Sequence, residues 1–584
     1  MGDYLVVCCR PGDAAARLLS LELAQRAEQE GMALSEPAPH AWLAVRGPAA
    51  PGLRRIGGWT LIGDVLDRRS PILPDTAPDD PWDYERKLVA RFWGRFVGIR
   101  WDVQGKPTAL LRDPSGALEC VAWTQAGLTV ICSSPQDWFI RRLRPDWSIN
   151  VPAVAAAVHT PLAGTGALLL RGPKALEPGA VQPFPLSEPA ATIWRPVDFA
   201  RLSLDPAPST GPAMSRLRDV VDEAVSGLAG LGGPMAMEVS GGLDSSIVAA
   251  SLVHQDRNAG PWIHAYGSTP ESDERSFVRL LGRALGFNPL CVPHQTAPMD
   301  RTWFDAVSSG FRPGLNGMDL VQDRAWGRHI RAAGASAVMT GKGGDSILFQ
   351  AANVNVFTDL WRAQGWRALA WPDLQELAAA NEISIWTMLR TAWRERRGGP
   401  RPLRREHPIL AALPAPLSLH PWLRDCETLG PAKTFQIAGV IDGVSHHGPS
   451  ALNRAVDVRH PLCAQPVVEA CLQLPTALLA LGARDRGLAR QAFRDRLPPE
   501  IAGRRSKGEM TRIYGRMVSD NLDFLRPWLM EGRLAALGVI DCEAADAELT
   551  PEALMWRGRY ADILTAAAYE GWVRCWERRL GPAA

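Results

Sequence analysis

The chain has 584 residues, 46% of them hydrophobic, and its 64 Lys and Arg nearly balance its 62 Asp and Glu, for a formal net charge of +2. This length predicts several domains with substantial cores, no apolar run reaches the length of a membrane span, and the charge lacks the basic excess of a nucleic-acid-binding protein. The ten cysteines form no C-x-x-C pair, and no basic-then-apolar targeting segment opens the chain. We therefore expect reduced thiols, a cytoplasmic location, no membrane span and no nucleic-acid partner.

The first predicted element is a buried strand over the apolar run Tyr4–Cys9. Because Cys8 and Cys9 lie inside this run, we expect both to be small buried hydrophobic side chains. The proline-rich stretch 183–212 predicts the boundary between a first domain, residues 1–205, and a second domain, residues 206–584. An amphipathic helix is predicted over 214–228, at the start of the second domain.

A strand, a phosphate-binding loop and a helix are predicted over 235–250, where an apolar run stops at a polar loop and an apolar helical pattern follows. The loop reads Ser240, Gly241, Gly242, Leu243, Asp244, Ser245 and Ser246. Its glycines let backbone N–H groups approach an anion, and its serines add hydroxyl donors at a helix N-terminus. Asp244 would repel phosphate unless a cation stood between them, so we expect it to bind Mg²⁺. The alternative to a phosphate-binding loop is a glycine turn capped by serine before an ordinary helix. Such a turn needs neither three hydroxyls nor an acid.

The next predicted strand covers 262–268, and a helix over 271–286 follows it, with apolar residues at helical spacing and Gly286 as its stop signal. We also expect Gly267, near the end of this strand, to be one of the residues that bind the nucleotide.

A second strand, loop and helix are predicted over 337–349. Three glycines, Gly341, Gly343 and Gly344, precede Asp345 in this loop. If the two loops follow neighbouring parallel strands, both face one crevice at the carboxyl ends of those strands. Asp244 and Asp345 would then share Mg²⁺ around a triphosphate. Taken alone, the second loop is also compatible with a tight strand-to-helix turn.

A tryptophan-rich and arginine-rich segment covers 357–405. Its tryptophans are Trp361, Trp366, Trp371, Trp386 and Trp393, and its arginines include Arg394, Arg396, Arg397, Arg401, Arg404 and Arg405. Such irregular tryptophan spacing is more typical of core filling than of a ligand platform. The arginines predict a solvated face, or a surface that binds the acidic part of a peptide or partner protein. Glu376 and Glu382 are the candidates here for a base that deprotonates an amine, although surface carboxylates are the simpler interpretation.

Three more segments follow in the C-terminal half: Arg459-His-Pro461, Asp485–Arg490 and Leu497–Gly508. The loop SGGLDSS resembles the pyrophosphate-binding motif of the ATP pyrophosphatases, which cleave ATP between the α and β phosphates. In order and spacing, all these segments resemble the synthetase domain of the asparagine synthetase B family, which includes asparagine synthetases, β-lactam synthetases and lasso peptide cyclases. The adjacent histidines 446 and 447 have no partner at metal-ligand spacing, so we do not expect zinc.

The resemblance implies ATP and Mg²⁺ as cofactors and an α/β fold with an ATP-pyrophosphatase-type doubly wound parallel sheet and added helices. It also implies that Lys507 stabilises charge on the phosphates during adenylation. Arg459, Arg486 and Arg490 fall on basic positions of the same pattern. A salt-bridged structural arginine remains the alternative for each of these three.

Segments of the N-terminal third, 92–98, 111–116, 129–134 and 171–179, resemble the glutaminase domain of the same family. The resemblance implies an Ntn-hydrolase-like αββα sandwich of antiparallel sheets. An active glutaminase in this family uses Cys as residue 2, whose free α-amine activates its own thiol. Residue 2 of this chain is Gly. We therefore expect a degenerate domain that supplies no ammonia, so the acceptor amine must belong to the substrate.

Within the family, the sequence favours a lasso peptide cyclase. Such an enzyme adenylates an Asp or Glu side chain of a precursor peptide, and the peptide's own α-amine then closes a macrolactam. A leader peptidase and a leader-binding protein are the partners that this function implies. A β-lactam synthetase is the alternative, but its Tyr base corresponds to Lys342 here. An asparagine synthetase using free ammonia and a non-catalytic paralogue are further alternatives; the retained Asp244, Asp345 and Lys507 argue against the latter.

Overall fold

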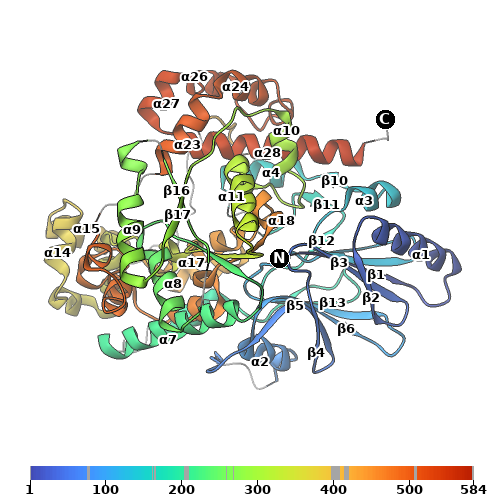
Figure 1. The fold of residues 1–584 in the computed structure, drawn as a ribbon, viewed down its shortest axis with the longest axis horizontal. Helices are drawn as coiled ribbons and strands as arrows, with labels where there is room; N and C mark the ends of the chain where they lie inside the picture. Colours follow the sequence, from blue (N-terminus) through green and yellow to red (C-terminus); the bar gives the residue numbers. More distant parts are fainter. Residues whose placement is uncertain are drawn as a thin grey trace.

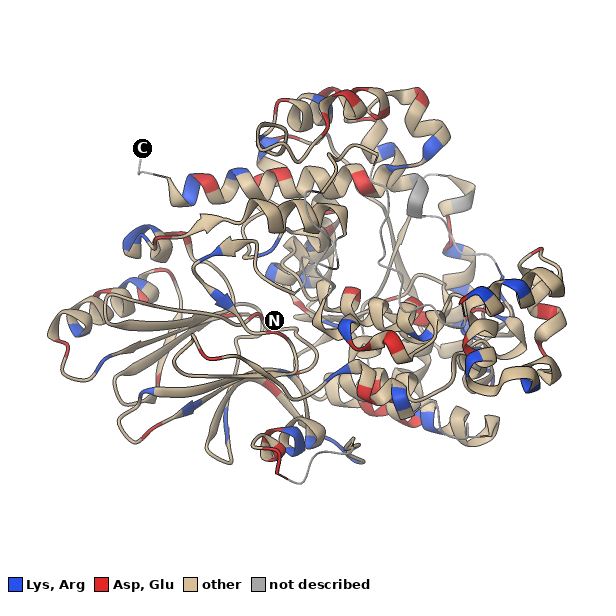
Figure 2. Ribbon diagram, turned by 180° about the vertical axis from the view of Figure 1, so that it is seen from behind, with Lys and Arg blue, Asp and Glu red and all other residues tan. Residues whose placement is uncertain are grey.

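The computed structural model describes residues 2–74, 79–160, 162, 166–202, 209–257, 260–267, 269–395, 408–413, 420–505 and 510–581. These residues form two stacked antiparallel sheets at the N-terminal end and a parallel sheet wrapped in helices beyond it (Figure 1). In Figure 2, acidic and basic residues are interspersed over both parts of the described chain, in agreement with the formal net charge of +2. The predicted α/β fold class is confirmed.

The N-terminal part contains two six-stranded antiparallel sheets. The first has the order β12 (Lys174–Ala175), β8 (Val121–Gln125), β9 (Leu128–Cys132), β1 (Asp3–Cys9), β3 (Ala41–Arg46) and β2 (Ala33–Ala38). The second has the order β14 (Ala191–Thr192), β13 (Ala180–Pro183), β7 (Pro107–Arg112), β6 (Phe92–Trp101), β5 (Trp59–Asp67) and β4 (Leu53–Ile56). A short pair, β10 (Ser148–Ile149) and β11 (Leu170–Arg171), lies beside them. The helices of this part are α1 (Ala14–Gln29), α2 (Asp83–Arg91), α3 (Asp137–Leu143) and α4 (Val151–His159).

Each sheet of this sandwich is covered on both faces, which explains why strand β1 is apolar without alternation. Its residues Tyr4 and Val6 point into the core between the two sheets, whereas Leu5 and Val7 pack with helix α1 on the outer face. Helix α2 packs on the outer face of the second sheet. The predicted αββα sandwich and the buried strand over 4–9 are confirmed, and burial raises the pKa of the Cys8 thiol to about 12.

The C-terminal part is built on a five-stranded parallel sheet. Its order is β17 (Pro289–Pro293), β16 (Trp262–Tyr266), β15 (Met235–Glu238), β18 (Ala337–Met339) and β19 (Asp457–Arg459). The chain runs outward from β15 to β17 and then returns to the other side of β15 with β18. The topological switch point therefore lies between β15 and β18, where α/β sheets of this kind bind their ligands.

Helices cover both faces of the parallel sheet, as in a doubly wound fold. On one face, Met235 and Met237 pack with α7 (Thr210–Ala229), α8 (Leu243–His254) and α9 (Arg275–Leu285). On the other face, Ala236 and Val338 pack with α11 (Leu320–Ala332) and α18 (Ala451–Ala455). The helix predicted over 214–228 lies within α7, and Gly286 ends α9 in the left-handed conformation, as predicted.

The remaining helices surround this core. They are α6 (Pro196–Arg201), α10 (Arg301–Val307), α12 (Gly344–Ile347), α13 (Val354–Gln364), α14 (Leu374–Ala380), α15 (Ile385–Glu395), α16 (Pro421–Arg424), α17 (Pro431–Ser445), α19 (Gln465–Leu472), α20 (Thr476–Leu479), α21 (Gly487–Ala492), α22 (Pro499–Ala502), α23 (Met510–Ser519), α24 (Leu522–Met530), α25 (Arg533–Ala536), α26 (Cys542–Glu548), α27 (Pro551–Arg557) and α28 (Tyr560–Leu580). Short 3₁₀ turns are η2 (Pro270–Ser272), η3 (Leu315–Gly317), η4 (Gly365–Ala370), η5 (Cys426–Thr428), η6 (Pro461–Cys463) and η7 (Leu481–Ala483). In the described part of the chain, no helix combines the length and apolar character needed to cross a bilayer.

Buried polar contacts fix the sandwich against the parallel sheet. Arg95 of β6 donates to Asp457 Oδ1 and Oδ2 of β19 at 3.0 and 3.1 Å, and Trp194 donates to Glu469 Oε1 at 2.7 Å. Removing one partner of a buried ion pair such as Arg95–Asp457 costs about 3–5 kcal/mol, because the other charge is left uncompensated. The boundary predicted between residues 205 and 206 falls within 203–208, outside the described residues, so the domain division stays a prediction.

Candidate functional site

The two glycine-rich loops meet at the switch point of the parallel sheet. The first joins the end of β15 to α8, and the second joins the end of β18 to α12. A cavity of about 280 Å³ lies between them. It is lined by Glu238, Ser240, Gly242, Leu243, Asp244, Ser245, Gly341, Lys342, Asp345, Arg486, Arg490, Ile501 and Arg504. Seven of the predicted nucleotide-binding and metal-binding residues therefore lie around one space.

The loops approach so closely that glycine is required at their contact. A Cβ on Gly341 would lie 2.4 Å from the backbone N of Ser245, and a Cβ on Gly344 would lie 2.5 Å from Asp244 Cγ. No heavy atom fits at such a distance in a packed interior. The absence of side chains at these two positions thus allows Asp345 to face Asp244.

Other predicted glycines have conformational roles and do not line the cavity. Gly241 and Gly343 adopt positive φ angles of 76° and 89°, which glycine reaches without steric cost. Gly267 leaves room for the Ser272 hydroxyl, because a Cβ there would lie 2.1 Å from Ser272 Oγ.

The three serines of the first loop differ in position. Ser240 and Ser245 line the cavity, and their hydroxyl oxygens lie 2.9 Å apart. Ser246 is fully buried and donates to the Gly242 carbonyl at 2.7 Å, so it stabilises the loop. The expectation that all three hydroxyls face phosphate is wrong for Ser246, because the turn of α8 points its side chain inward.

Arg486 bridges the two acids. Its Nη1 donates to Asp244 Oδ2 at 2.7 Å and to Asp345 Oδ1 at 2.6 Å. Both carboxylates can thus reach one positive centre, and two oxygen donors fit Mg²⁺, which usually takes one or two protein carboxylates and completes its shell with water and phosphate oxygens. The φ of Arg486 is +53°, an uncommon conformation for a residue other than glycine, held by the bond from its N–H to the Phe349 carbonyl at 2.9 Å.

Two more arginines flank the cavity. Arg490 donates to Asp485 Oδ2 at 2.7 Å and to the Ala502 carbonyl at 2.9 Å. Arg504, which the sequence did not single out, donates to the Gly241 carbonyl at 3.1 Å, pairs with Glu274 and stacks over Phe277. The first loop is therefore braced by a residue far along the chain.

Arg459 does not reach the cavity. It is 3% exposed, and it donates to Asp457 Oδ2 and to the carbonyls of Leu228 and Gly232. Arg459 is therefore a salt-bridged structural arginine, the alternative that the sequence had left open. Lys507 lies in 506–509, outside the described residues.

Glu238 and Lys342 form a part of the cavity wall that the sequence did not reveal as a site. Burial raises the pKa of Glu238, the neighbouring Lys342 lowers it, and Asp323 raises it further. Lys342 Nζ donates to Asn316 Oδ1 at 3.1 Å. A carboxylate with a raised pKa is suited to accept a proton near neutral pH. The signal available in the sequence was an acid inside an apolar strand, two residues before the loop.

The other base candidates are placed away from this cavity. Glu376 and Glu382 are exposed, on α14 and just after it, and neither lines the cavity. The surface interpretation holds for both, because α14 packs against α13 and α15 rather than against the loops.

The tryptophans of the same region differ in burial, and Trp371 is half-buried. Trp361 is buried, whereas Trp366, Trp386 and Trp393 are 70%, 77% and 51% exposed. Core filling is therefore wrong for these three: Trp366 lies in the short turn η4, and Trp386 and Trp393 lie on α15, whose buried residues are Met388 and Ala392. The arginines at 396, 397, 401, 404 and 405 lie outside the described residues.

The histidine pair His446 and His447, near the second loop, is half-buried. Burial, followed by the neighbouring Arg95, lowers the pKa of His447 to about 3, which keeps its ring neutral. Within the described ranges, no group of three His, Cys, Asp or Glu side chains is arranged to hold a metal ion.

The amino terminus has no space for a nucleophile at residue 2. A Cβ on Gly2 would lie 2.0 Å from the Arg46 carbonyl oxygen, and the Gly2 N–H donates to the Ala49 carbonyl at 2.9 Å. The backbone of the loop after β3 thus fills the volume that a side chain would need.

A family model described as asparagine synthase matches residues 216–574, from within α7 to within α28. This match includes the parallel sheet, both loops and Arg486, and it covers more than half of the chain. No curated protein matches the chain. The family's members are ATP-dependent ligases that form C–N bonds, and the match includes both glycine-rich loops of the cavity. The chain therefore belongs to the asparagine synthase family.

Proposed function

We propose that the protein forms a macrolactam on a precursor peptide. It adenylates an Asp or Glu side-chain carboxylate of the peptide and joins this carboxylate to the peptide's own α-amine, releasing AMP and pyrophosphate. The observation that carries the proposal is a two-loop adenylation cavity attached to a sandwich whose residue 2 has no room for a side chain.

The first step requires a bound triphosphate. Ser240, Ser245 and the backbone N–H groups at the start of α8 supply donors, and the dipole of this helix favours phosphate at its N-terminus. Asp244 and Asp345 would hold Mg²⁺, which neutralises charge on the leaving pyrophosphate. Arg486, which bridges these carboxylates, and Arg490 add positive charge on the same side of the cavity. Lys507 is proposed to stabilise the same charge.

The second step joins the amine to the activated carboxyl carbon. A C–N bond forms, the bond from the acyl carbon to the AMP oxygen breaks, and the amine must lose a proton. Glu238 is proposed to accept this proton, because it lines the cavity and its raised pKa lies closer to neutrality than that of an ordinary glutamate. Since donor and acceptor belong to one bound peptide, proximity supplies much of the rate.

The source of the amine distinguishes this proposal from its alternatives. Gly2 removes the glutaminase nucleophile, which argues against glutamine-dependent asparagine synthesis. Lys342 occupies the position of the tyrosine base of the β-lactam synthetases, which argues against closure of a small ring by their mechanism. A leader peptidase and a leader-binding protein are proposed partners, in the cytoplasm, because a free α-amine requires removal of the leader.

The test compares three sets of substrates in ATP–pyrophosphate exchange and AMP release. They are the leaderless core peptide of the precursor that the proposed function requires, aspartate with ammonium, and a small β-amino acid. The proposal expects AMP release with the core peptide alone. Turnover restricted to aspartate with ammonium, or to the β-amino acid, would contradict it and identify the corresponding alternative.

A further inference from the structure

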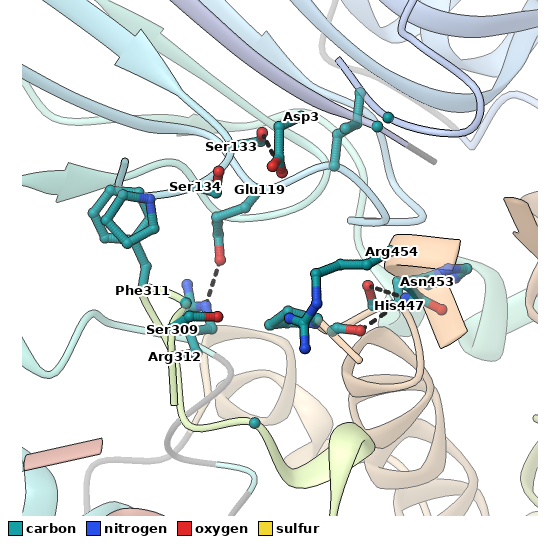
Figure 3. Close-up of a pocket in the computed structure, with 18 of the residues that line it drawn as sticks. Asp3, Glu119, Ser133, Ser134, Ser309, Phe311, Arg312, His447, Asn453 and Arg454 are labelled. Atoms are coloured by element: carbon teal, nitrogen blue, oxygen red, sulfur yellow. Dashed lines mark hydrogen bonds and ion pairs between the residues drawn. The ribbon is translucent and has the colours of Figure 1, made fainter. Parts of the chain in front are cut away.

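A second and larger space lies between the sandwich and the parallel-sheet part. It is a cleft of about 1,020 Å³, lined from the sandwich by residues 116–119 and 133–138 and from the C-terminal part by residues 309–316, 444–445 and 447–449 (Figure 3). This volume is at the upper end of the roughly 300–1,000 Å³ found for small-molecule pockets. A ligand that fills it has the size of a short peptide.

The cleft carries an excess of positive charge. Eight arginines line it, against four carboxylates. Several of these arginines are already engaged; Arg312, for example, pairs with Glu119 at 2.6 Å. Arg454 and Arg141 have no carboxylate within ion-pair distance among the described residues, so the charge excess is concentrated on them.

Arg454 is an exposed cation that lines the cleft on the side of the C-terminal part. Figure 3 shows it between the sandwich wall, near Asp3, and the segment that carries His447 and Asn453. Its guanidinium donates to the Ala306 carbonyl at 3.2 Å. Desolvation and then the neighbouring Arg324 lower the pKa of Arg454, and the more distant carboxylates of Asp323 and Asp3 offset this only in part. An anion in the cleft would supply the missing compensation.

The cleft adjoins the adenylation cavity. Asn316 lines the cleft and accepts the hydrogen bond from Lys342, which lines the cavity. His460 lines the cleft as well, and its Nδ1 lies 2.7 Å from Oγ1 of Thr340, at the start of the second loop. The two spaces therefore share a wall at Lys342 and Asn316, and an extended ligand with its reacting carboxylate in the cavity would cross this pair to reach the cleft.

Residue 2, which would be the N-terminal nucleophile of an active glutaminase, is a glycine in this cleft and has no side chain that could react. Gly2 lines the cleft, and a side chain at this position would collide with the Arg46 backbone. Binding is the role that its residues support.

We propose that the interdomain cleft is a subsite for the peptide substrate, in which Arg454 binds a carboxylate of the segment beyond the reacting residue. This inference rests on the proposed function and adds a role for the sandwich: it forms one wall of the subsite.

The test measures binding of the fluorescein-labelled core peptide in the absence of ATP, so that recognition is separated from catalysis. A charged hydrogen-bonded pair contributes enough that Arg454→Ala should weaken binding about 10-fold or more. Arg454→Lys, which keeps the charge, should restore part of the affinity. Arg331→Ala removes an exposed arginine of α11 outside the cleft and should leave affinity unchanged.

A thermodynamic cycle identifies the partner of Arg454. Peptides in which each carboxylate other than the reacting one is amidated are tested against the wild type and Arg454→Ala. One amidated peptide should bind the wild-type protein as weakly as the native peptide binds Arg454→Ala. Combining this peptide with Arg454→Ala should cause no further loss of affinity. Two results would contradict the proposed subsite. One is that the loss of affinity caused by amidation and the loss caused by Arg454→Ala multiply for every peptide; the other is that Arg454→Ala binds the native peptide with unchanged affinity. If the peptide turns over with ATP while Arg454→Ala keeps its affinity, the subsite fails and the proposed function stands; if the wild type neither binds nor converts the peptide, both fail.

Discussion

Replacing Gly341 by alanine should separate the two loops of the proposed adenylation cavity. The added Cβ would lie 2.4 Å from the Ser245 nitrogen, 2.6 Å from Ser245 Cα and 2.9 Å from the Asp244 carbonyl carbon. All three are backbone atoms at the start of α8, so no flexible side chain can move aside. Relaxing the closest contact to ordinary van der Waals distance requires a shift of about 1 Å.

The cost of this shift differs between stability and activity. Overpacking of this size typically lowers the free energy of unfolding by about 1–3 kcal/mol, which a well-packed domain can tolerate. A displacement of about 1 Å between groups that must converge on one substrate costs about 10²-fold in rate. The variant should therefore remain folded while AMP release falls about 10²-fold.

The assay combines AMP release with thermal unfolding. The matched control is Gly211→Ala, in the first turn of α7, where an added Cβ meets nothing within 4 Å and φ is not positive. This control should keep both activity and melting temperature. A folded Gly341→Ala protein with wild-type AMP release would refute the claim that contact between the two loops sets the geometry of the site.

The remaining predictions concern the acids, the lysine, the amino terminus and the base. Asp244→Asn, Asp345→Asn and Lys507→Ala should each lower pyrophosphate release by at least about 10²-fold with the fold intact; near-normal turnover would remove that residue from the site. The wild type should release no glutamate from glutamine, and Gly2→Cys should lower the melting temperature; glutamate formation by the pure wild type would show that the sandwich is an active glutaminase. Because Glu238 accepts a proton only when ionised, and burial raises its pKa, the rate of amide formation should rise with pH through a value above the ordinary glutamate pKa of about 4.3. Glu238→Gln should lower that rate about 10²–10⁴-fold and abolish this rise, whereas an unchanged pH profile would exclude Glu238 as the base.

Local sequence patterns were sufficient to predict the framework of the site. An apolar run followed by glycines, a hydroxyl or acid and a helical pattern is a short-range signal, and it located both loops, Asp244 and Asp345. The pairing of these loops followed from the rule that ligands bind at the carboxyl ends of parallel strands. The αββα sandwich, in contrast, came from family resemblance, because a strand buried on both faces shows no alternation.

Contacts between distant segments were not predictable in the same way. Arg486 lies 242 residues from Asp244 in the chain, and no local pattern tells which arginine of the C-terminal half will reach the loops. Ser246 was expected at the phosphates, but helical geometry turned it inward. The exposed tryptophans of α15 and η4 could not be separated from the buried Trp361 by spacing, because burial there depends on how the surface helices pack.

The most direct test of the proposed function is mass spectrometry of the leaderless core peptide after incubation with the purified protein, ATP and Mg²⁺, with AMP measured in the same sample. We expect a product lighter than the linear peptide by one water, formed in equal amount to AMP and absent when ATP is omitted. AMP release without loss of water from the peptide would contradict it.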